Sequence, residues 1–88
     1  MYRSGVLYLV LMFRTPDFQS SALEAHVAFL DSLRAKGCIE MAGPFTDKTG
    51  GAYLLRAADL GEAVALAFSD PLHTTGSSRV TVHEWKAS

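Results

Sequence analysis

The sequence has one cysteine, almost no net charge and no long hydrophobic run. Cys38 cannot form an internal disulfide on its own. The chain has eight Lys and Arg residues and nine Asp and Glu residues, for a net charge of −1, and the basic residues are scattered along it. This pattern gives no electrostatic footprint for nucleic acid or an anionic membrane. The longest apolar run, Val6 to Phe13, is too short to span a bilayer and lacks the flanks of a secretory signal. We therefore expect a cytoplasmic protein with no nucleic-acid or membrane partner.

Motifs for metals and cofactors are also missing. The three histidines, His26, His73 and His83, are not spaced as metal-ligand pairs, and there is no C-x-x-C motif. Gly50-Gly51 are not followed by a helix and so do not form a phosphate-binding loop. We expect a protein that works without a bound metal or cofactor.

The 88 residues suffice for one domain, residues 1–88, with one modest core. Hydrophobic residues make up 49% of the chain, which is too apolar for a disordered segment and indicates a folded one. This apolar content in so small a chain also suggests burial beyond the core of a monomer.

A strand and a helix are predicted in the first half of the chain. The run Val6 to Phe13 has no polar face, which is typical of a strand buried on both sides. After the break at Pro16, Ser21 and Glu24 match the S-x-x-E capping box that starts a helix. An apolar stripe then follows at helical spacing, and Gly37 is placed to end the helix. The stripe consists of Leu23, Val27, Leu30 and Leu33.

A hairpin follows this helix. Residues 38–42 predict a short strand, and Gly43-Pro44 turns the chain out of it. Residues 45–51 are polar and contain glycine, which favours a loop, and residues 52–57 predict the returning strand.

The last third of the chain predicts a second helix and a final strand. Asp59 with Glu62 forms another helix start, and the helix is expected to stop before Asp70-Pro71. Residues 79–85 alternate Val80, Val82 and Glu84 with Thr81, His83 and Trp85, which predicts a strand with two unlike faces.

The predicted order is βαββαβ, which is typical of an α+β, ferredoxin-like fold with a four-stranded antiparallel sheet. Both helices would cover one face of that sheet. Because the strand Val6 to Phe13 is apolar on both faces, the other face also needs a cover. A second copy of the same sheet supplies it, so we expect a homodimer.

This topology brings three connections, residues 14–20, 43–51 and 69–78, to one end of the sheet. His26, in the second turn of the first helix, and Asp70, after the second helix, would lie at that end. Each residue also has a plain structural interpretation. His26 would be a half-buried histidine bonded to a carbonyl, and Asp-Pro a common way to end a helix. A carboxylate at a helix C-terminus nevertheless meets the negative end of the dipole, and a histidine cation would offset that cost.

Several residues stand in a characteristic order and spacing: His26, Leu30, Leu33, Gly37, Gly43-Pro44, Gly50-Gly51, Asp70-Pro71 and Gly76. From about Val6 to Trp85 this pattern resembles the YCII-related (YciI-like) family. The resemblance implies a dimeric α+β barrel built from two ferredoxin-like sheets. It also implies an active site in which His26 faces Asp70. Most members of that family have no established reaction, and one dehydrochlorinase acting on a chlorinated hydroxyquinone is known among them.

Two departures from the family pattern bear on the predicted site. Family members often carry an arginine shortly before the histidine, where this chain has residues 20–23, Ser-Ser-Ala-Leu. An aromatic residue is common after Asp-Pro, where this chain has Leu72 and then His73. His73 is therefore either a polar substrate contact or an exposed loop residue.

Two functions remain open at this point. The first is a small cofactor-independent enzyme acting on a cyclic or aromatic-derived molecule. In it His26 transfers a proton and Asp70 orients the imidazole, for elimination, isomerisation or hydrolysis. The expected substrate-binding residues are Gly43, Pro44, Phe45 and His73. The alternative is a homodimer that binds a small ligand or has a regulatory role without catalysis. RNA binding, which occurs on the same element order, is disfavoured because Gly51 stands where a stacking aromatic belongs.

Overall fold

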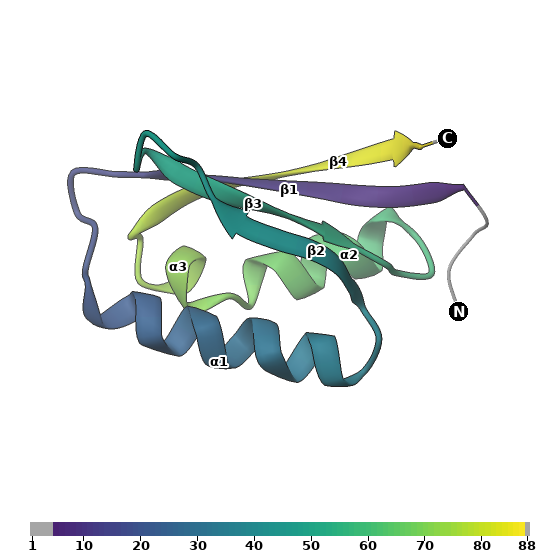
Figure 1. The fold of residues 1–88 in the computed structure, drawn as a ribbon, viewed down its shortest axis with the longest axis horizontal. Coiled ribbons are helices and arrows are strands. Elements are labelled where there is room, and N and C mark those ends of the chain that lie inside the picture. Colours follow the sequence, from purple (N-terminus) through teal and green to yellow (C-terminus); the bar gives the residue numbers. More distant parts are fainter. Residues whose placement is uncertain (1–4, 88) are drawn as a thin grey trace.

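A computed structural model describes residues 5–87, which form a four-stranded antiparallel sheet with three helices on one face (Figure 1). The strand order is β2-β3-β1-β4, so β1 lies in the middle of the sheet, between β3 and β4. The predicted α+β, ferredoxin-like fold is confirmed, with one helix more than expected. In chain order the elements are β1 (Val6–Arg14), α1 (Ser21–Ala35), β2 (Ile39–Pro44), β3 (Gly50–Leu55), α2 (Leu60–Phe68), α3 (Pro71–Thr74) and β4 (Ser78–Lys86).

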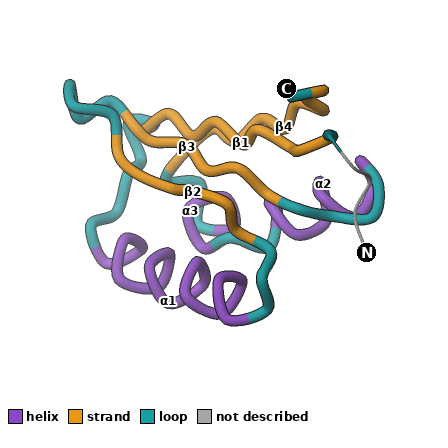
Figure 2. The backbone as a smooth tube through the Cα atoms, turned by 45° about the vertical axis from the view of Figure 1, so that its right-hand side comes forward, coloured by secondary structure: helices purple, strands orange, loops and turns teal. Residues whose placement is uncertain are grey.

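The central strand β1 presents different residues to the two faces of the sheet. Tyr8, Val10 and Met12 are buried and face the helices, where they form the middle of the core. The view in Figure 2 shows α1, α2 and α3 on this same side, with the other side of the sheet uncovered. We call the uncovered side the open face. The strand register places on it Leu7, Leu9, Leu11, Phe13, Met41, Leu54 and Trp85.

The start of α1 differs from the predicted capping box. The helix begins at Ser21, and Ser20 occupies the cap position in a helical conformation, with no side-chain hydrogen bond to the first turn. Backbone carbonyls satisfy the first amides instead. Ala22 N–H donates to Gln19 O at 3.0 Å and Leu23 N–H to Ser20 O at 3.1 Å. A tight turn before the helix therefore replaces the side-chain cap.

The buried face of α1 is also rotated from the predicted stripe. Leu33 is buried as expected, but Ala22 and His26 are buried alongside it. Leu23 is 37% exposed and Val27 is 55% exposed. Two apolar residues of the stripe thus lie at the edge of the helix–sheet contact rather than inside the core, and the next section shows that they border a cavity.

The segment after α2 contains the helix that the sequence did not predict. α2 ends at Phe68, and Asp70 begins α3 rather than ending α2. Pro71 occupies the first turn of α3, where its missing N–H costs nothing, and Asp70 is held in the extended conformation that a following proline favours. The carboxylate of Asp70 therefore lies at the start of a helix, and the unfavourable dipole contact expected from the sequence does not arise.

Both strands of the hairpin reach two residues further toward its loop than predicted, β2 to Pro44 and β3 from Gly50. β2 extends through Pro44, which an edge strand tolerates because its outer side needs no backbone donor. β3 begins at Gly50, where the absence of a side chain is required: a Cβ there would collide with the Met12 carbonyl of β1. The other strand ends differ from prediction by one or two residues, which is the usual uncertainty at element boundaries.

Candidate functional site

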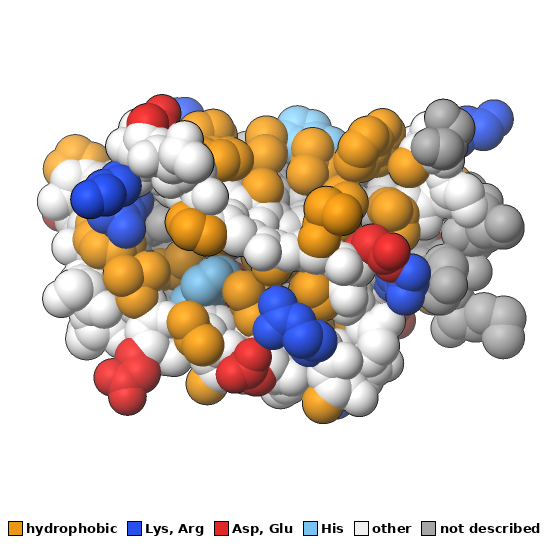
Figure 3. Space-filling model, in the orientation of Figure 1, with side chains coloured by type: hydrophobic (Ala, Val, Ile, Leu, Met, Phe, Trp, Pro, Cys, Tyr) orange, Lys and Arg blue, Asp and Glu red, His pale blue; other side chains and the backbone are white. Residues whose placement is uncertain are grey.

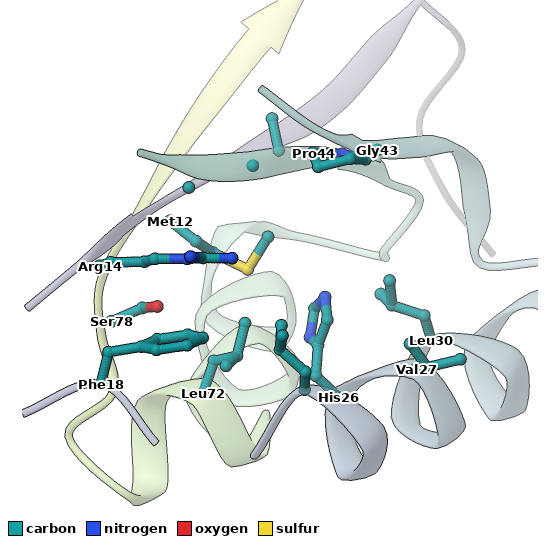
Figure 4. A pocket seen from close by; sticks show the side chains of 14 residues that line it. Met12, Arg14, Phe18, His26, Val27, Leu30, Gly43, Pro44, Leu72 and Ser78 are labelled. Carbon is teal, nitrogen blue, oxygen red and sulfur yellow. The ribbon is translucent and has the colours of Figure 1, made fainter. Parts of the chain in front are cut away.

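A cavity of about 380 Å³ lies between the sheet and α1. The space-filling view shows hydrophobic side chains surrounding a recessed histidine on this side of the molecule (Figure 3). The close-up in Figure 4 shows the lining residues converging from the sheet, α1 and α3. Most of the wall is apolar, which is typical of a small-molecule site. The lining residues are Met12, Arg14, Phe18, Leu23, His26, Val27, Leu30, Gly43, Pro44, Gly50, Gly51, Ala52, Leu72 and Ser78.

His26 and Asp70 meet at the inner side of this cavity. His26 Nδ1 lies 2.7 Å from Asp70 Oδ2. His26 is 8% exposed and Asp70 is fully buried. A charge-assisted hydrogen bond of this length between largely buried side chains holds both of them in one arrangement.

The carboxylate of Asp70 is fixed by its own local structure. Its Oδ1 accepts a hydrogen bond from the Leu72 backbone N–H at 2.8 Å, which caps the first turn of α3. Its Oδ2 is then directed at α1 and at His26. Each oxygen has one partner, so α3 sets the orientation of the carboxylate and the carboxylate sets that of the imidazole.

The bond at Nδ1 decides which imidazole nitrogen is available. Because the carboxylate accepts at Nδ1, the neutral ring carries its proton there, and Nε2 keeps its lone pair. His26 lines the cavity, and within residues 5–87 Nε2 has no hydrogen-bond partner. An Nε2 lone pair at a mostly apolar wall is positioned to accept a proton from a bound molecule.

Tyr53 of β3 is buried beside His26 and does not line the cavity. Its ring centroid is 6.4 Å from that of His26. Burial, and to a lesser extent the negative charge of Asp70, raise the pKa of the Tyr53 phenol far above its ordinary value. The hydroxyl is buried and has no hydrogen-bond partner within the described residues. Tyr53 therefore stays neutral beside the Asp70 carboxylate.

The structure places the four predicted substrate-binding residues in different surroundings. Gly43 and Pro44 line the cavity. Phe45 lies outside it, because its ring packs against Phe13 at 5.6 Å between centroids, on the side of the open face. His73 also lies outside, since its ring stacks on Phe68 at 4.3 Å. The continuation of β2 through Pro44 and the turn of α3 are what direct these two rings away.

Three lining residues were not singled out from the sequence. Arg14 and Ser78 are paired across β1 and β4, and Phe18 lies in the loop before α1. The sequence offered one indication of their role: they lie in two of the three connections that were predicted to meet at the end of the sheet where His26 and Asp70 lie. Their side chains could be assigned to the cavity only once the strand register was known.

Two kinds of site are missing from residues 5–87. No group of three or more His, Cys, Asp or Glu side chains is arranged to hold a metal ion. No helix there is long and apolar enough to cross a membrane.

Comparisons with known proteins agree with this architecture. The YCII-related domain model matches residues 6–86. The chain belongs to the YCII-related domain family. A relative described as an uncharacterized protein, YjpA of Bacillus subtilis (strain 168), is 46% identical over 79 residues, which cover 90% of this chain and 93% of YjpA.

A solved structure shares the fold of this YCII-related domain. It is the 5-chloro-2-hydroxyhydroquinone dehydrochlorinase TftG from Burkholderia phenoliruptrix AC1100, in complex with 2,5-dihydroxybenzoquinone. The match has a TM-score of 0.73 and 24% sequence identity, and it covers 93% of this chain and 95% of that one. At this identity the likeness establishes a common fold along nearly the whole chain.

Proposed function

We propose that this YCII-related domain is a small-molecule enzyme in which His26 transfers a proton and Asp70 orients it. The observation that carries the proposal is the 2.7 Å contact between His26 Nδ1 and the buried Asp70 Oδ2 beside an apolar cavity. A histidine held in this way has a free Nε2 and a carboxylate that stabilises the imidazolium formed on proton uptake.

The chemistry can be written with these two residues alone. Nε2 takes a proton from a carbon or oxygen atom of the substrate, and the electron pair stays on the substrate. In an elimination that pair expels a leaving group from the neighbouring carbon. In an isomerisation the imidazolium returns the proton at another position, and in a hydrolysis Nε2 takes the proton from an attacking water. None of these steps changes the oxidation state of a protein group.

The substrate we propose is a cyclic or aromatic-derived small molecule, and elimination is the reaction that the fold comparison favours. The protein of the same fold is named as a dehydrochlorinase of a chlorinated hydroxyhydroquinone and was solved with a quinone. A cavity of about 380 Å³ holds one ring of that size, and its apolar wall favours burial of the ring.

We also propose that the functional unit is a homodimer in which a second copy covers the open face. That face carries exposed Met41, Trp85 and Phe13, at 62%, 46% and 36% exposure. Leu9 and Leu11 lie half-buried in the middle of the same surface. Large apolar side chains gathered on one side of a sheet are typical of an interface between subunits.

Hydrogen exchange tests the catalytic proposal. Cyclic compounds with an acidic C–H bond, including 2,5-dihydroxybenzoquinone, are incubated with the protein in D₂O, and loss of the C–H signal is followed by NMR. We expect exchange with at least one compound, reduced about 100-fold or more in His26→Gln, because a positioned base contributes that much. Asp70→Asn should reduce it as well.

Two results would contradict the proposed enzymatic activity. One is exchange at the buffer rate for every compound. The other is equal exchange by the native protein and His26→Gln. Ligand-induced stabilisation of the native protein without any exchange would instead support the non-catalytic binding dimer.

A further inference from the structure

The cavity contains one permanent charge, and it belongs to Arg14. The residue ends β1, and the strand alternation directs its side chain to the helix side, as for Met12. Figure 4 shows the Arg14 side chain extending from the end of β1, near Phe18, in the direction of His26. Apart from His26, the other lining side chains carry no ionisable group.

Arg14 is held in position without an ionic partner. Its backbone N–H donates to Thr49 O at 2.9 Å, which fixes the strand end that carries it. Its guanidinium carbon lies 4.2 Å from the centroid of the Phe18 ring. Within residues 5–87 no carboxylate forms an ion pair with it. A guanidinium with one face on an aromatic ring keeps its N–H donors free at the edge of the plane.

The loop that supplies Phe18 is itself fixed. Phe18 N–H donates to Thr15 O at 3.1 Å, and Gln19 N–H donates to Ser77 Oγ at 3.1 Å. The Arg14–Phe18 pair is thus built from two segments that are each hydrogen-bonded to the rest of the fold. The backbone that carries both side chains is therefore already ordered before a ligand binds, which lowers the cost of binding.

The shape of the cavity restricts the ligand further. Gly43 and Gly51 contribute bare backbone on the sheet side, and Leu23 and Val27 contribute apolar side chains on the α1 side. A space between flat backbone and aliphatic side chains suits a planar ring. Arg14 is exposed to solvent, so its charge is hydrated in the free protein and lies at the mouth. A ligand anion can replace that water with charge-assisted hydrogen bonds.

We propose that Arg14 is the anion-binding residue of this cavity and that the ligand is a flat organic monoanion, such as a phenolate or an aryl carboxylate. The anionic oxygen contacts the guanidinium at the mouth, and the ring extends inward past Phe18 toward His26. This inference rests on the proposed function for the assignment of the cavity as the substrate site, and it adds the chemical class of that substrate.

The test compares two probes of the same shape and different charge, benzoate and benzamide. Dissociation constants are measured by NMR titration, with the side-chain N–H signal of Arg14 as the local reporter. We expect benzoate to bind the native protein about tenfold or more tightly than benzamide, as one charged hydrogen-bonding contact implies. Arg14→Met should weaken benzoate to the level of benzamide and leave benzamide unchanged.

Further variants separate charge from geometry and from folding. Arg14→Lys keeps the charge but loses the planar fork, so an intermediate affinity is expected. Arg34→Met removes an exposed arginine of α1 that pairs with Asp31, and it should leave both affinities unchanged. Circular dichroism and the melting temperature verify that each variant is folded.

Several results would overturn the proposal: equal affinity for the two probes, no measurable binding of either, unchanged benzoate binding in Arg14→Met, or the same loss in Arg34→Met. The variant His26→Ala distinguishes failure of this proposal from failure of the proposed catalysis. If His26→Ala still prefers benzoate and the native protein shows no hydrogen exchange, the anion site is supported and the catalytic role is not. Exchange that depends on His26, without a preference for benzoate, does the reverse.

Discussion

His26 Nδ1 and Asp70 Oδ2 lie 2.7 Å apart although the two residues are 44 positions apart in the chain. The contact joins α1 to the start of α3, so it links the two helical segments that border the cavity. The same hydrogen bond is therefore expected to serve both the stability of the fold and the orientation of the imidazole.

Asp70→Asn separates these roles from helix capping. Asparagine can still accept a hydrogen bond at the start of α3, but it no longer offers a carboxylate to His26. We expect the free energy of unfolding in urea to fall by about 1–3 kcal/mol, because one partner of a buried hydrogen bond is lost. The matched control is Asp59→Asn, which also caps a helix but is exposed and holds no histidine. It should change stability by less than about 0.5 kcal/mol. Equal losses would mean that capping, not the histidine contact, accounts for the effect.

Glycine at position 51 is required where β2 and β3 approach each other. A Cβ there would lie 2.7 Å from the Gly43 carbonyl oxygen, so the backbone has to move to admit it. Gly51→Ala is expected to reduce the free energy of unfolding by about 1–3 kcal/mol. A Cβ at Gly43 has no neighbour within 4 Å, so Gly43→Ala serves as a control within the same cavity wall and should be tolerated. Comparable urea midpoints for the two variants would contradict this account.

Much of the fold follows from local sequence patterns. The dense apolar run of β1, the alternation in β4 and the glycine after α1 each favour one structure, and together they admit few arrangements of four strands. His26 and Asp70 could be predicted to lie at the same end of the sheet, because the element order alone fixes the direction in which each strand and helix runs.

The details of the site depend on contacts that no local pattern encodes. The dipeptide Asp70-Pro71 equally favours the end of one helix or the start of another, and the docking of α3 against α1 decides between them. Leu23 and Val27 match a core stripe, but the helix is rotated so that His26 is buried in their place. Arg14 and Phe18 come together only through the bonds that fix the loop before α1.

The buried phenol of Tyr53 predicts a loss of stability in alkali. Burial and the Asp70 charge raise its pKa in the folded state above the value of about 10 in the unfolded chain. Its contribution is fully present below about pH 10 and is lost as the pH rises further, because the unfolded chain then binds fewer protons. Tyr53→Phe removes the ionisable hydroxyl, which has no hydrogen-bond partner within residues 5–87. The decrease in the urea midpoint between about pH 8 and about pH 11 should therefore be smaller for the variant than for the native protein. Identical falls would show that other groups cause the alkaline loss.

The proposed dimer predicts a specific response to charge on the open face. Leu11 lies in the middle of that face, opposite Ala52 on β3 and Thr81 on β4. Light scattering of the native protein should give twice the chain mass of 9.5 kDa. Leu11→Lys should give a single chain mass, because a buried lysine without a partner opposes association at the centre of an apolar interface. Leu60→Lys replaces an exposed leucine at the start of α2, on the helical side, and this variant should remain a dimer. If the native protein is folded and light scattering gives the mass of a single chain, the proposed homodimer is wrong.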